Sequence, residues 1–404
     1  MAVPKIRIKG YTDEWNCSTV GNVANVVGGG TPSTYDNMCW GGSIQWFTPS
    51  EIGKDKYVQK SERTITKVGL EQSSAKLIPV NSILLTSRAT IGEMSINLCE
   101  CATNQGFQSL IPNGVNLDFL YALMKTKQNT LIRESSGSTF LEISANKVRS
   151  MEISIPNTLE QEAIGSYFQS LDSLIEATDK KIATLKQTKQ ASLQSMFPKE
   201  GETKPRVRFK GFTDEWKKVQ LSDCLEISSE KNLYNEYGVN NVLSVSDEVG
   251  VVNQIEFLGR SYAGKSVTNY KVLRTNQIVY TKSPLKAKPY GIVKVNKGSV
   301  GIVSVLYAVY DTKENVYPDY IHYYFDPSYR INNYLLLLIN KGAKNTMNIS
   351  DEVALTGKIC IPSYEEQKQI AEYFSNLDKQ ISIQEQRLEK LKQIKSACLK
   401  NMFV

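Results

Sequence analysis

The chain contains an internal duplication in which two matched ends enclose two dissimilar middles. KIRIKGYTDEW at residues 5–15 recurs as RVRFKGFTDEW at residues 206–216. IPNTLEQEAIGSYFQSLD at residues 155–172 recurs as IPSYEEQKQIAEYFSNLD at residues 361–378. Neutral drift after duplication would blur ends and middles alike, whereas here the middles alone have diverged. The repeat therefore predicts a pseudo-twofold frame that holds two different inserts.

Each copy of the second matched segment predicts a long helix. Asn157 and Ser363 are each followed three residues later by glutamate, which is the capping-box spacing of a helix start. Apolar residues then alternate at spacings of four and three, the period of a coiled-coil seam. A plain amphipathic core helix is the alternative for either copy alone, but two copies with one seam favour mutual antiparallel pairing. The seam positions are Ile164, Phe168, Leu171, Ile175, Ile182 and Leu185 in the first helix and Ile370, Phe374, Leu377, Ile381, Leu388 and Leu391 in the second.

These features predict the domain organisation and the fold class. Short β-branched runs alternate with turn clusters in both inserts, which indicates mixed α/β domains. We expect the fold class α/β (α+β), with two mixed domains separated by a pair of long antiparallel coiled-coil helices. The expected segments are insert one at 1–155, the first helix at 156–197, a linker at 198–205, insert two at 206–358 and the second helix at 359–404.

Composition argues against several classes of protein. His322 is the single histidine, so a histidine-based metal site or a duplicated histidine-dependent centre is implausible. Seven cysteines form no paired framework, which favours a reducing cytoplasm. Cys99 and Cys101 have no second pair at zinc spacing. No apolar run reaches roughly 18 residues and no signal peptide is visible, so we expect a cytoplasmic protein with no membrane span. We also expect no metal site and no catalytic residue in this chain.

Insert two contains a basic stretch at residues 257–310, with nine lysines and arginines, no acidic residue and six interleaved tyrosines. Cations with aromatic and hydroxyl neighbours suit contact with the phosphates and bases of DNA. A solvated charged surface is the alternative, although such surfaces usually mix both signs. The candidate DNA-binding residues of this insert are Lys265, Ser266, Tyr280, Lys282, Ser283, Lys286, Lys288, Tyr290, Lys344 and Asn345.

Insert one carries polar, glycine-rich turns in place of charge, at residues 28–34, 40–50, 86–92 and 104–109. Arg88 and Gln105 suit base reading, because arginine pairs bidentately with guanine and glutamine with adenine. Each could equally be an ordinary loop residue. The candidate DNA-binding residues of this insert are Thr31, Ser33, Trp40, Trp46, Ser87, Arg88, Gln105, Phe107, Ser138 and Thr139.

Residues 259–266, GRSYAGKS, match the P-loop pattern in full, so a nucleotide-hydrolysing protein is one alternative function. A P-loop follows a buried strand and opens a helix, whereas residues 255–258 predict a weak strand and the residues after the motif predict turn and strand. The motif is also absent from the other insert. A second alternative is a scaffold that uses the coiled coil for assembly alone, which the basic stretch disfavours.

The whole pattern resembles the DNA-specificity subunit of bacterial type I restriction–modification systems. The resemblance rests on the two [FY]TDEW openings, the repeated helix starts, GGTPS, WGGSIQW, TSRATIG, NQGFQSLIP and GSTFLEIS in insert one, and GRSYAGKSV, QIVYTKSP and GIVSVLYAVY in insert two. It implies that 1–155 and 206–358 are target-recognition domains, each reading half of a bipartite double-stranded DNA target, and that the helices are conserved spacers. It also implies two adenine-methyltransferase subunits and two translocating restriction subunits as partners. S-adenosylmethionine, ATP and Mg²⁺ would serve those partners, while this chain would hold no cofactor and would not be an enzyme.

Overall fold

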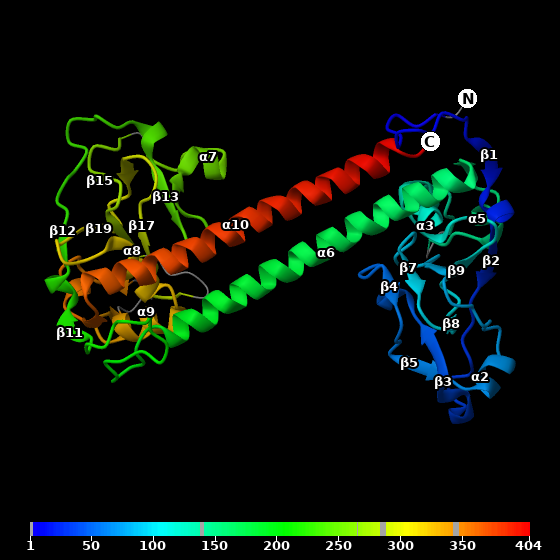
Figure 1. Ribbon diagram of the computed structural model, residues 1–404, viewed down its shortest axis with the longest axis horizontal. Coiled ribbons are helices and arrows are strands. Elements are labelled where there is room, and N and C mark those ends of the chain that lie inside the picture. The colour runs from blue at the N-terminus through cyan, green and yellow to red at the C-terminus, as the bar shows by residue number, and fades with distance from the viewer. Residues whose placement is uncertain (1–2, 138–140, 265, 283–287, 342–346) are drawn as a thin grey trace. The chain divides into compact units, whose positions relative to one another are not determined.

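The computed structural model describes residues 3–137, 141–264, 266–282, 288–341 and 347–404. The chain divides into two compact units, the first made of 1–180 and 385–404 and the second of 181–384. Each unit combines one insert with a segment of each long helix, α6 (Thr158–Ser195) and α10 (Tyr364–Asn401) (Figure 1). Both units mix helices and strands, and the predicted fold class is confirmed.

The first unit is built around two sheets. Its strands are β1 (Asn16–Thr19), β2 (Ala24–Gly28), β3 (Trp40–Phe47), β4 (Tyr57–Val58), β5 (Arg63–Ile65), β6 (Ile83–Leu85), β7 (Met94–Asn97), β8 (Cys101–Thr103), β9 (Gln108–Pro112) and β10 (Glu152–Ile155). Its shorter helices are α1 (Val20–Val23), α2 (Lys67–Glu71), α3 (Leu117–Thr126), α4 (Gln128–Arg133) and α5 (Ala145–Arg149). The larger sheet has the order β2-β9-β6-β7-β4 and the smaller β5-β3-β8, while β1 pairs with β10.

The second unit has a different sheet arrangement. Its strands are β11 (Lys217–Gln220), β12 (Leu225–Ile227), β13 (Leu243–Ser246), β14 (Gly250–Asn253), β15 (Lys271–Leu273), β16 (Ile278–Thr281), β17 (Val293–Val295), β18 (Gly301–Val303), β19 (Tyr307–Thr312), β20 (Asn340–Lys341), β21 (Met347–Asn348) and β22 (Lys358–Ile361). Its shorter helices are α7 (Gln254–Leu258), α8 (Pro318–Phe325) and α9 (Ser328–Leu336). The main sheet has the order β12-β19-β16-β17, and β11 pairs with β22 as β1 pairs with β10.

The side chains at the seam positions of α6 and α10 are buried or half-buried. Thr178 falls on the seam of α6 and is buried. Its hydroxyl donates to the Leu174 carbonyl at 2.7 Å, so the buried polar group has a hydrogen-bond partner. The helices run antiparallel in each unit. In the first, Phe168 of α6 stacks on Phe403, just beyond α10. In the second, Phe374 of α10 stacks on Phe197, just beyond α6. Neither these helices nor the others in the described ranges have an apolar stretch long enough to cross a bilayer.

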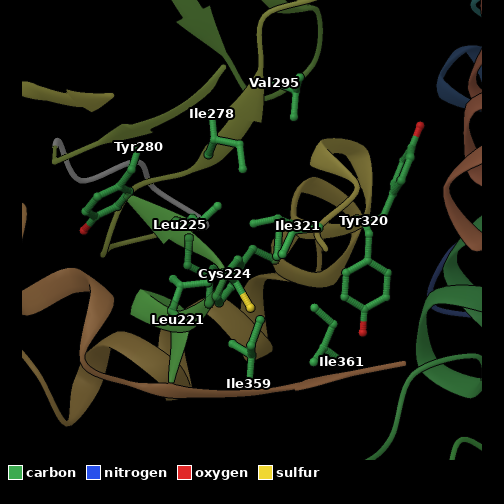
Figure 2. Close-up of a cluster of buried hydrophobic side chains, with 14 of the residues drawn as sticks. Leu221, Cys224, Leu225, Ile278, Tyr280, Val295, Tyr320, Ile321, Ile359 and Ile361 are labelled. Atoms are coloured by element: carbon green, nitrogen blue, oxygen red, sulfur yellow. The ribbon is translucent and has the colours of Figure 1, made fainter. Parts of the chain in front are cut away.

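Each unit has an apolar core that joins its insert to the helices. In the second unit, Ile359 and Ile361 of β22 face the same cluster as Ile321 of α8 and Ile278 of β16 (Figure 2). Trp216, from the repeated TDEW sequence, is also buried there, and its counterpart Trp15 is buried in the core of the first unit. The repeated tryptophans are therefore packing residues of the frame.

Two local expectations were wrong. Residues 255–258, expected as a weak strand, lie in α7, whose start is capped by the Asn253 side chain accepting from the amides of Ile255 and Glu256. At the start of α6, Asn157 caps the amide of Glu160 at 2.9 Å, but the Glu160 carboxylate binds Arg7 instead of completing a capping box.

Candidate nucleic-acid interface

The frame holds both inserts through one set of contacts that is made twice. Arg7 forms a bidentate ion pair with Glu160 at 2.7 Å, and Arg208 forms the same pair with Glu366 at 2.6 and 2.7 Å. Both carboxylates have 0% exposure, so each pair fixes the opening segment of its repeat on the start of a long helix. A buried charge needs such a partner, because desolvation alone would be costly.

Two glutamines attach the helix starts to the inserts. Gln161 accepts from the Asn116 amide at 3.0 Å and donates to the Pro156 carbonyl at 2.9 Å. Its counterpart Gln367 accepts from the Tyr317 amide at 2.9 Å and donates to Pro362. Asn116 and Tyr317 are the N-cap residues of α3 and α8, so the same amide contact positions a corresponding helix in each insert.

Two lysines occupy the far ends of the helical seams, and each pairs with an aspartate of the other long helix. Lys395 of α10 pairs with Asp172 of α6 at 2.6 Å, and Lys189 of α6 pairs with Asp378 of α10 at 2.8 Å. These positions correspond in the repeat, so the two pairs are the same contact with the helices exchanged. Burial opposes the charge of Lys189, but the carboxylates of Asp326 and Asp378 raise its pKa above the usual value.

The polar loops of insert one converge in the first unit. The Gly30 amide donates to the Thr103 carbonyl at 2.8 Å, and a side chain at Gly30 would collide with Ser74 and Ala75. The Thr31 hydroxyl donates to the Gln105 side chain at 2.5 Å, which joins the 28–34 loop to the 104–109 loop. The Trp40 indole donates to the Ser33 carbonyl at 2.9 Å. Three segments that are separate in the sequence therefore form one polar surface.

The structure sorts the candidates of insert one by exposure. Thr31, Ser33 and Gln105 are exposed, and Trp40 is half-buried. The Arg88 side chain is 43% exposed and pairs with Glu142 at 2.8 Å. The side chains that are buried, and so packed beneath this surface, are those of Trp46, Ser87 and Phe107. Ser138 and Thr139 lie outside the described residues.

The basic stretch of insert two is largely neutralised by carboxylates from elsewhere in the chain. Of the seven cations of this stretch that the structure describes, six form ion pairs within the chain. The pairs are Lys271–Asp351 and Lys282–Asp351, Lys288–Asp247 and Lys294–Asp247, Arg274–Glu230, and Lys297–Asp319. Burial would raise the pKa of Asp351, but hydrogen bonds from the two lysines hold that pKa below its usual value.

The other candidates of insert two are divided between the interior and the surface. Tyr280 and Tyr290 are buried, and the Tyr280 hydroxyl donates to the Tyr290 carbonyl at 2.7 Å. Lys288 is also buried. Ser266 is exposed, and its hydroxyl lies 3.0 Å from that of Thr268. The candidates outside the described residues are Lys265, Ser283, Lys286, Lys344 and Asn345.

The P-loop match lies in the wrong structural context. Helix α7 comes before Gly259, which ends it with a φ of 75°. The described residues after Gly259 form no helix before β15 begins at Lys271. The order is helix, loop and strand, whereas a P-loop needs strand, loop and helix to hold phosphate at a helix N-terminus. Across the described ranges there is also no cluster of side chains suited to a metal ion.

Arg63 is an exposed residue of the first unit that the sequence patterns did not indicate as a site residue. It opens β5 opposite Trp46, and its guanidinium lies 3.5 Å from the centre of the Trp40 ring. The pairing of β3 with β5 creates this contact, and the sequence carries no local signal for that pairing.

Comparison with known proteins finds a matching family model and several related sequences. A family model described as type I restriction modification DNA specificity domain matches residues 12–187 and 213–393. Over 239 residues the chain is 31% identical to the type I restriction enzyme MjaIX specificity subunit of Methanocaldococcus jannaschii, covering 54% of this chain and 53% of that protein. It is 30% identical over 169 residues to the EcoR124I/EcoR124II specificity subunit of Escherichia coli, covering 40% and 41%. The chain spans about half the length, or less, of these curated relatives.

The fold has solved counterparts. The type I restriction–modification S subunit from M. genitalium has a TM-score of 0.61 and 14% identity, covering 100% of this chain and 99% of that one. A chain from a structural study of type I restriction–modification complex assembly has a TM-score of 0.52 and 15% identity, covering 97% and 98%. At these identities the likeness concerns the fold. Because the family model matches both repeats and most of the sequence, the chain belongs to the type I restriction modification DNA specificity family.

Proposed function

We propose that this chain is the sequence-specific DNA-binding subunit of a type I restriction–modification complex and recognises a bipartite double-stranded target. One half of the target would be read by residues 1–155 and the other by residues 206–358. The observation that carries the proposal is the doubled frame: the same buried Arg–Glu pair holds two inserts whose sheets differ. Two inserts of different structure, held by the same contacts, suit a DNA target made of two different half-sequences.

The chemistry would belong to partner subunits. The relatives are named as specificity subunits of restriction enzymes, which supports methyltransferase and restriction subunits as partners. Two copies of each are what the family resemblance implies. S-adenosylmethionine, ATP and Mg²⁺ would be used by those subunits. The helix–loop–strand order around Gly259 supports a non-catalytic role for this chain, because it lacks the geometry with which a P-loop holds nucleotide phosphates.

The test is to express the chain with its methyltransferase in cells without other adenine methylation and to map N6-methyladenine across the genome. The expected motif has two specified halves separated by unspecified base pairs. Methylation at a single continuous motif would contradict the bipartite reading. Mg-ATP titrated into the isolated chain should show no saturable binding; micromolar binding that is lost in Lys265→Ala would favour the nucleotide-hydrolysing alternative.

A further inference from the structure

An aromatic platform in the first unit carries one arginine. The Arg63 guanidinium carbon lies 3.5 Å from the Trp40 ring centre and 5.7 Å from that of Trp46. The two indoles meet edge to face with 5.1 Å between ring centres. The Trp46 indole is buried and donates to the Gly30 carbonyl at 2.9 Å, so the platform is anchored to the interior of the unit.

Among the described residues the guanidinium N–H groups of Arg63 have no hydrogen-bond or ion-pair partner, whereas three other arginines of the same unit have one. Arg7 binds Glu160, Arg88 binds Glu142, and Arg149 donates to the Val26 carbonyl at 3.0 Å. Within the part of the chain that the structure describes, the Arg63 guanidinium lies over the two indoles, and the residue is exposed. A guanidinium stacked on an aromatic ring keeps its N–H groups directed outward in its own plane.

The platform lies beside the polar loops. The Trp40 indole donates to the Ser33 carbonyl at 2.9 Å, which fixes the loop that also carries Tyr35, whose side chain is 98% exposed. The Thr66 hydroxyl, next to β5, donates to the Met38 carbonyl at 2.7 Å. Arg63 therefore belongs to the same surface as the exposed loop candidates.

We propose that Arg63 is a specificity-determining residue that donates to O6 and N7 of a guanine in the half-site read by the first unit. This inference rests on the proposed DNA-recognition function and adds a residue and a base to it. A bidentate arginine–guanine contact needs a planar donor fork in a fixed orientation. Trp40 supplies that orientation before DNA arrives, so less side-chain freedom is lost on binding. A phosphate contact is less demanding, because a lysine ammonium can also make it as a point charge.

The test compares methylation motifs in cells that carry the full chain with its methyltransferase. The variants are Arg63→Ala, Arg63→Lys and, as the matched control, Arg133→Ala, which changes another exposed arginine of the same unit on α4. Arg63→Ala should lose about 5- to 150-fold of discrimination at one G·C pair of one half-sequence. Arg63→Lys should also show relaxed base specificity at that G·C pair, because an ammonium group lacks the planar fork of donors. Arg133→Ala should keep the wild-type motif.

The unaffected half-sequence serves as the internal control for folding, since it requires an intact chain. A wild-type motif in Arg63→Ala, or a uniformly weaker signal that Arg63→Lys restores, would overturn the guanine assignment while leaving the proposed function standing. Absence of any bipartite motif with the wild-type chain would instead overturn the proposed function, and the guanine assignment with it.

Discussion

Removal of the Glu160 carboxylate should destabilise the first unit strongly. Glu160 has 0% exposure, and the Arg7 side chain that it binds at two points is 12% exposed. Glu160→Ala would leave a mostly buried guanidinium with two donors unpaired, and breaking a buried ion pair in this way costs about 3–5 kcal/mol. Because Arg7 keeps some access to water, we expect about 3 kcal/mol. In a unit of about 200 residues, that loss lowers Tm by roughly 6–12 °C.

Differential scanning calorimetry of the full chain would measure this shift. The double variant Arg7→Met with Glu160→Leu is the control, since it removes both charges and replaces them with apolar volume. It should recover much of the loss, because replacing a buried pair with hydrophobic groups is often close to neutral. The corresponding variant Glu366→Ala should destabilise the second unit by a similar amount. A Tm change below about 2 °C in Glu160→Ala would refute the view that this pair anchors the repeat.

Three further predictions concern a titration, an ion pair and the spacing of the target. Burial lowers the pKa of His322 to about 4, whereas an unfolded histidine titrates near 6.5. The free energy of unfolding should therefore be full above about pH 6.5 and fall by up to about 3 kcal/mol as the pH drops to 4. Urea titrations at several pH values should find this slope in the wild type and not in His322→Gln. Lys282→Ala should leave the slope of log K against log salt for DNA binding unchanged, because its ammonium pairs with Asp351; a slope smaller by about one unit would mean that Lys282 contacts phosphate. Inserting four residues near Lys186 and four near Lys392 adds about 6 Å to each long helix. The unread spacer between the half-sequences should then lengthen by one or two base pairs, while both half-sequences stay the same. An unchanged spacer would contradict the idea that the helices set its length.

The parts of the fold that the sequence predicted are those coded by local periodicity. Positions such as Phe168 and Phe374 recur at coiled-coil spacing, and that spacing alone identifies the buried face of a long helix. The fully buried Trp216 and its counterpart in the first unit could be assigned to the frame because the repeat contains both. These features need no knowledge of which distant segments meet.

The electrostatics of the candidate site could not be predicted in the same way. The basic stretch has no acidic residue along the chain, yet Asp351 reaches Lys271 from 80 residues away. The platform under Arg63 likewise depends on the pairing of β5 with β3, and the sequence does not specify this pairing. Net charge along a segment therefore overstated the free positive charge on its surface, because the fold supplies counter-charges from elsewhere in the chain.

The central claim, that two inserts read the two halves of one target independently, is tested most directly by an exchange. Residues 1–155 would be replaced by the corresponding segment of another specificity subunit with a known target, and N6-methyladenine would be mapped with the methyltransferase present. We predict that one half-sequence changes to that of the donor while the other half and the spacer stay as in the wild type. A chimaera that folds and directs methylation but changes both halves, or neither, would contradict the claim.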